Sequence, residues 1–191
     1  MDIFDLLRTE VIVHDDEISE HVAFKVKEIQ GNNQTFGRDQ MTMENHVKSG
    51  SILEIGLAKL IDGVVNPNLF DSSDPESFAW DVEKGGVRFE VKSSPKADSW
   101  FNFNLHGVEN SSNETLTRVN LTTFLKYSSY SNFIIAGYYT ESGSGYVVKF
   151  KWLMKSLTFQ NYVKKSRASG KGTTNYYDIV SSKRNLDCFE L

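Results

Sequence analysis

The sequence predicts an α/β protein with a central mixed β-sheet flanked by helices. Three observations support this prediction: a glycine-centred hairpin at 80–94, an amphipathic helix at 51–62, and an apolar strand at 132–140 that returns as a hairpin partner at 146–153. Together they supply the strands and the covering helix that a mixed fold needs. A chain of 191 residues is long enough for a core, so we expect residues 1–191 to form a single domain.

The hairpin at 80–94 organises the rest of the prediction. Its two glycines, Gly85 and Gly86, can adopt the positive φ angles that a two-residue turn requires. In that register Asp81 faces Glu90 across the strand pair. A three-residue loop would place Asp81 on the opposite face, because side chains alternate along a strand.

Two facing carboxylates predict a bound cation. Asp81 and Glu90 would lie about 5 Å apart and repel each other unless positive charge is placed between them. Oxygen ligands favour Mg²⁺, with Mn²⁺ as its substitute. Lys92 lies on the same face as Glu90, where its ammonium group could hold a phosphate or a water molecule. These groups suit the hydrolysis of a phosphodiester.

The helix at 51–62 adds a third carboxylate. Ser51 fits an N-cap and Glu54 the matching capping-box position. Glu54 also falls within the apolar arc that Leu53 and Leu57 define, where a carboxylate is costly unless it is paired or binds a metal. Two interpretations therefore stay open: Glu54 caps its own helix, or it points at the metal site.

Asp81, followed after eight residues by Glu90-Val91-Lys92, resembles the core motif of the PD-(D/E)xK nuclease superfamily. The proline that names the motif is absent, and Trp80 precedes the aspartate. The resemblance implies a restriction-endonuclease-like fold and a metal bound by Asp81, Glu90 and the Val91 carbonyl. It also implies that Lys92 activates water and that a helical glutamate upstream, here Glu54, completes or orients the metal ligands.

The densest positive charge lies at 164–173. Lys164, Lys165, Arg167 and Lys171 stand there among serine and glycine residues, which predicts a mobile basic loop. Such a loop is either a solvated surface feature or a contact for the phosphate backbone of DNA. Both interpretations stay open.

Composition limits the remaining possibilities. The net charge is −4, which argues against a strong non-specific binder of nucleic acid. A single cysteine, Cys188, excludes an internal disulfide framework. The chain shows neither a signal peptide nor an apolar run of membrane-spanning length, so we expect a cytoplasmic protein without a membrane partner. His14, His21 and His46 are interpreted as surface or structural residues.

We therefore expect a magnesium-dependent DNA endonuclease, either of the restriction type or a phage nuclease that degrades foreign DNA. A Holliday-junction resolvase or repair nuclease of the same fold is the alternative within this class. The rivals outside it are a non-catalytic nucleic-acid- or protein-binding domain and a hydrolase of small nucleotide esters. The small size favours a compact enzyme, and a homodimer would allow two strands to be cut.

Overall fold

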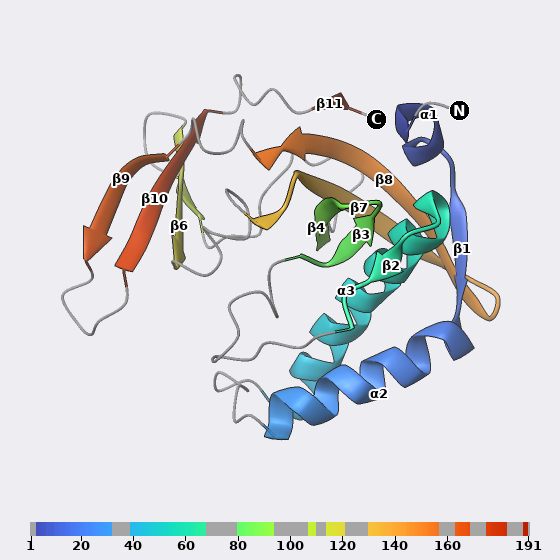
Figure 1. Ribbon diagram of the computed structural model, residues 1–191. Coiled ribbons are helices and arrows are strands. Elements are labelled where there is room, and N and C mark those ends of the chain that lie inside the picture. Colours follow the sequence, from blue (N-terminus) through green and yellow to red (C-terminus); the bar gives the residue numbers. More distant parts are fainter. Residues whose placement is uncertain are drawn as a thin grey trace.

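The computed structural model describes residues 3–31, 39–67, 80–93, 107–109, 114–120, 130–156, 163–168, 175–182 and 189–190. Helices and strands follow in the order α1 (Ile3–Leu7), β1 (Val11–His14), α2 (Asp15–Gly31), α3 (Gln40–Ile61), β2 (Val64–Val65), β3 (Val82–Lys84), β4 (Val87–Ser93), β5 (Gly107–Glu109), β6 (Glu114–Asn120), β7 (Phe133–Ser142), β8 (Gly145–Lys155), β9 (Val163–Ala168), β10 (Asn175–Ser182) and β11 (Phe189–Glu190). Figure 1 shows how these elements are arranged.

The main sheet is mixed, as the sequence predicts. Its strand order is β1-β8-β7-β4-β3-β2, and β11 also pairs with β8. Strands β4 and β7 run parallel, whereas the other neighbours run antiparallel. Helix α3 contacts β1, β2, β3, β4, β7 and β8, and α2 packs against α3 and β1 (Figure 1). The predicted hairpin partners at 132–140 and 146–153 are β7 and β8.

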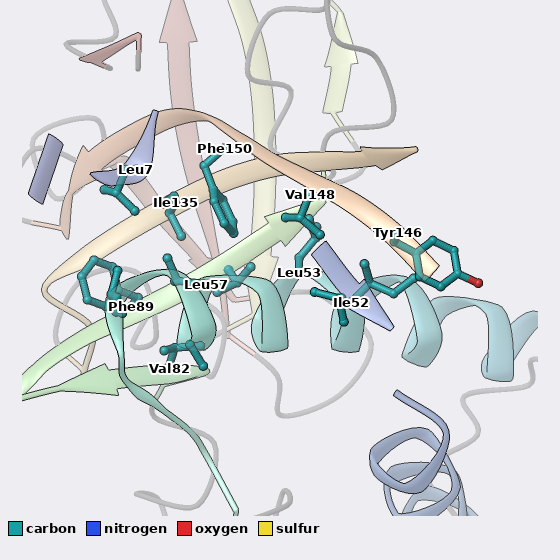
Figure 2. Packing of buried hydrophobic residues seen from close by; sticks show 14 of the residues in the cluster. Leu7, Ile52, Leu53, Leu57, Val82, Phe89, Ile135, Tyr146, Val148 and Phe150 are labelled. Atoms are coloured by element: carbon teal, nitrogen blue, oxygen red, sulfur yellow. The ribbon is translucent and has the colours of Figure 1, made fainter. Parts of the chain in front are cut away.

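A hydrophobic core fixes α3 on this sheet. Leu53 and Leu57 of α3 are fully buried and belong to one cluster with Phe89, Ile135 and Val148 of the strands. Figure 2 shows these side chains between the helix and the sheet. Complete burial of such a side chain contributes about 1.5–3 kcal/mol. The packing therefore fixes which face of α3 is turned toward β4.

Helix α3 begins eleven residues before the start that the sequence predicts at Ser51. Its N-cap is Asp39, whose carboxylate accepts a hydrogen bond from the backbone N–H of Thr42 at 2.9 Å. Ser51 lies within the helix and is fully buried, so the capping-box interpretation of Ser51 and Glu54 was wrong. The pattern misled because Ser and Glu three residues apart also occur inside helices, where no backbone N–H is left to cap.

A second sheet has the order β5-β6-β10-β9. Strand β9 pairs with β10, with Lys165 opposite Asp178 and Arg167 opposite Tyr176. Lys164, Lys165 and Arg167 thus lie on a strand, and the prediction of a loop was wrong for this part. The reason is that pairing with β10 supplies backbone hydrogen bonds that the polar local sequence does not reveal. Lys171 lies outside the described residues.

Helix α2 is lightly anchored compared with α3. Its buried residues are Ile18 and Val26, whereas nine residues of α3 are buried. A cavity of about 390 Å³ lies between the two helices, and Ile18, Val22 and Lys48 are among its lining residues.

Within the described residues, neither α3 nor any other helix combines the length and apolarity of a membrane span.

Candidate functional site

The hairpin has the two-residue turn that the sequence predicts. Gly85 and Gly86 have φ angles of 56° and 82°, and Lys84 pairs with Val87. Such angles cost glycine little because it has no Cβ. The turn thereby sets the register in which β3 pairs with β4, and so the positions of the acidic residues at the start of β3.

Glu83 faces Arg88 one step further from the turn, and the two side chains form an ion pair of 3.1 Å between Oε2 and Nε. The guanidinium group of Arg88 also lies 5.8 Å from the centre of the Trp80 ring, within cation–π range. These contacts stabilise the hairpin on its polar side.

Asp81 lies one residue before β3. Its backbone N–H donates to the Phe89 carbonyl at 2.9 Å. Its carboxylate Oδ2 accepts a hydrogen bond of 2.7 Å from the backbone N–H of Val91. Asp81 therefore lies beside the peptide that joins Glu90 to Val91.

Glu90 is almost completely buried, at 1% exposure. Lys92 donates from Nζ to Glu90 Oε1, and the same Nζ lies 3.3 Å from the Val91 carbonyl oxygen. Val91 is thus the common point of the hairpin site: its N–H binds Asp81, and its carbonyl is next to Lys92. A buried carboxylate needs such a cation, because an isolated charge is strongly disfavoured away from water.

The two faces of β4 divide the site. Phe89 and Val91 pack in the core with residues of α3. Side chains alternate along a strand, so Glu90 and Lys92 point to the other face of β4. The Asp81 carboxylate accepts from the Val91 N–H and is close enough to Glu54 to raise its pKa.

Glu54 is buried on the α3 side and is held by α2. Lys25 donates from Nζ to Glu54 Oε2 at 2.5 Å, and His21 Nε2 lies 3.5 Å from the same oxygen. His21 and Lys25 are separated by one helical turn, which places both on one face of α2. Glu54 thus bonds to a neighbouring helix rather than to its own helix end.

Glu54 stays charged despite its burial. Burial by itself raises the pKa of Glu54, and the nearby Asp81 carboxylate raises it further. The ammonium group of Lys25 and the nearby His21 outweigh both effects, so the pKa of Glu54 lies below its ordinary value. Glu54 is therefore a buried negative charge that lies near Asp81 and is stabilised by Lys25.

The donors are of the type that a hard divalent cation prefers, since three carboxylates and the Val91 carbonyl all present oxygen. Lysine ammonium groups hold two of the carboxylates, Glu54 and Glu90. In the described part of the chain, no three His, Cys, Asp or Glu side chains are arranged to hold a metal ion. The structure thus places Glu54 near Asp81 and bonds the Asp81 carboxylate to the Val91 N–H. Lys92 pairs with Glu90, and Lys25 pairs with Glu54.

Two residues near Glu54 were not predicted as part of the site. Lys25 received no role, and His21 was interpreted as a surface or structural residue. Their spacing of four residues would have placed them together once a helix was assigned. Nothing in the local sequence, however, identifies Glu54, 29 residues further along, as their partner.

The comparisons with known proteins give one family. The sequence model of the family described as bacteriophage T4 endonuclease IV matches residues 3–178. This match covers the helices α1 to α3, the hairpin and the strands as far as β10. No curated protein and no solved structure matches the chain.

Proposed function

Because the chain belongs to the bacteriophage T4 endonuclease IV family, we propose that it is a divalent-metal-dependent DNA endonuclease whose site is formed by Asp81, Glu90, Lys92 and Glu54. Membership of an endonuclease family implies a nuclease that acts on DNA. The observation that carries the assignment of the site is the convergence on Val91. Asp81 binds its N–H, and Lys92 lies beside its carbonyl while it pairs with the buried Glu90.

In this proposal Asp81, Glu90 and the Val91 carbonyl hold Mg²⁺ or Mn²⁺, and Glu54 completes or orients this set. The cation would supply Lewis acidity and positive charge against the charge that develops on the phosphate. Lys92 holds and orients the attacking water beside the scissile phosphate. The backbone N–H of Val91 keeps the Asp81 carboxylate oriented.

The mixed sheet and the order Glu54, Asp81, Glu90, Lys92 agree with a restriction-endonuclease-like arrangement, which is part of the proposal. Lys164, Lys165 and Arg167, with Lys171, are proposed to contact the phosphate backbone. Lys164, Lys165 and Arg167 have a fixed spacing along β9. A homodimer would place two such sites on two strands of DNA.

The site is tested by Asp81→Asn, Glu90→Gln and Lys92→Ala. Each variant is incubated with linear, circular, single-stranded and branched DNA in the presence of Mg²⁺, and its fold is checked by circular dichroism. We expect each change to abolish cleavage, because each removes a ligand or the group that orients water. Full activity in any folded variant would reject that residue's role.

Glu83→Gln is the matched control. Glu83 lies on the same hairpin, but it pairs with the part-exposed Arg88 rather than with the site, so cleavage should persist. A non-catalytic binding domain would instead bind DNA without cleaving it and would take up no metal. Calorimetry with Mg²⁺ separates that outcome from an inactive enzyme preparation.

A further inference from the structure

Lys25 of α2 places a positive charge on Glu54, a carboxylate of the proposed metal site. Lys25 Nζ lies 2.5 Å from Glu54 Oε2, so its ammonium group occupies an oxygen that the proposed function offers to a metal. The neighbouring Asp81 carboxylate adds a second negative charge. Lys25 thus lies where two neighbouring carboxylates concentrate negative charge, and such a place attracts cations.

We propose that Lys25 is an exchangeable counter-cation, which neutralises Glu54 in the metal-free protein and gives up this contact when a divalent cation binds. This inference rests on the proposed function. A divalent cation near Glu54 and Asp81 would repel the ammonium group at contact distance, since like charges in a partly buried site are poorly screened. Lys25 is thus a positioning residue that acts through Glu54.

The surroundings of Lys25 allow it to leave. Its side chain is 19% exposed, and a lysine ammonium group sits on a flexible four-carbon stem. Helix α2 contributes few buried residues and borders a cavity of about 390 Å³. Lys25 thus combines a flexible stem with a place on the less buried of the two helices.

Another lysine between the same helices shows what a fixed contact looks like. Lys59 donates from Nζ to both carboxylate oxygens of Glu17, at 2.8 and 2.9 Å, and to the Ile12 carbonyl at 2.8 Å. Three acceptors hold this ammonium group. It also lies in a different cluster of residues from Glu54. Lys59 is therefore the matched control for Lys25.

The first test is calorimetric titration of the full chain with Mn²⁺ in the absence of DNA. We expect Lys25→Met to bind Mn²⁺ about tenfold more tightly than the wild type, because a competing charge is removed. Lys59→Met should leave the affinity unchanged, and Glu54→Gln should lower it. Lys25→Arg keeps the charge and should not show the gain.

Whether Lys25→Met strengthens or weakens Mn²⁺ binding decides whether Lys25 is an exchangeable counter-cation. If Lys25 only holds Glu54 in place, Lys25→Met will bind Mn²⁺ equally or more weakly, and the inference is overturned. If wild-type protein takes up no metal, the proposed function and this inference both fail. Uptake that is lost in Asp81→Asn but not strengthened in Lys25→Met refutes the inference alone.

A second measurement needs no variant and so does not depend on how well Lys25→Met folds. Lysine acylation of the wild-type protein, followed by mass spectrometry, reports how accessible each amine is. Adding Mg²⁺ should raise labelling of Lys25 and leave Lys59 unchanged. An unchanged rate at Lys25, at a Mg²⁺ concentration where binding is saturated, would contradict the exchange.

Discussion

Two lysine–glutamate pairs join α2 to α3, and they differ in burial and in direction. In the pair near β3, Lys25 of α2 contacts Glu54 of α3 at 2.5 Å, with side chains 19% and 11% exposed. In the other pair, Lys59 of α3 contacts Glu17 of α2 at 2.8 Å, with side chains 36% and 33% exposed. Both pairs join a lysine to a glutamate, but the side chains of the first pair are less exposed to solvent.

The exposed pair has a local structural use. Glu17 accepts a hydrogen bond from the backbone N–H of His14 at 2.7 Å, at the start of α2, and such contacts satisfy the free donors of a helix end. Glu54 has no comparable use, since it lies in the middle of α3. A buried ion pair often stabilises a fold no better than apolar residues of similar volume. The comparison therefore separates Glu17, whose role in the fold is evident, from Glu54, for which we propose a role in the metal site.

Removing each carboxylate in turn should give the largest difference between the two ion pairs. Glu54→Gln should reduce kcat/KM for DNA cleavage about a hundredfold, the upper range for groups that orient a metal site, whereas Glu17→Gln should leave it near the wild-type value. Initial rates at saturating Mg²⁺ measure both. Equal losses in the two variants would mean that Glu54 acts through the fold and not through the site.

Removing each lysine sharpens the difference in stability. Lys25→Met leaves a buried carboxylate without its cation and should cost about 3 kcal/mol of unfolding free energy. Lys59→Met breaks a part-exposed pair and should cost less than about 1 kcal/mol. Urea denaturation in EDTA compares them without metal binding. Similar costs would show that burial does not distinguish the pairs.

The smallest expected effect is a pH dependence of the exposed pair. Burial raises the pKa of Glu17, but its hydrogen bond with His14 and its pairing with Lys59 outweigh this and hold the pKa below the ordinary 4.5. The stability from Glu17 is therefore present above pH 4.5 and is lost as the pH falls through the lowered pKa. The difference in unfolding free energy between wild type and Glu17→Gln should shrink on acidification, and denaturation series at neutral and acidic pH will reveal this. A difference that does not shrink would exclude the charge of Glu17 as its source.

The sequence predicts the hairpin well and the helices less well. The turn at Gly85 and Gly86 fixes the register within a few residues, and the ion pair of Glu83 with Arg88 confirms it. The start of α3 was mispredicted at Ser51, because a capping pattern says nothing about a longer helix that begins at Asp39. Local chemistry sufficed where the structure is local.

The strand β9 and the contacts of Glu54 could not be predicted in the same way. Lys165 lies on a strand because β10 pairs with it, and that pairing is not local. The ion pair of Lys25 with Glu54 requires α2 to fold onto α3. Each contact depends on the packing of separate elements, for which alternation and turn residues carry no signal.

The glycine turn, the hairpin register and the order of Asp81, Glu90 and Lys92 could be predicted from the sequence alone, because φ preferences and alternation act over a few bonds. The position of Glu54 beside Asp81 and its contact with Lys25, in contrast, became visible only in the packed structure. The physical reason is that burial and charge compensation depend on which surfaces meet. That information appears only once the helices pack on the sheet.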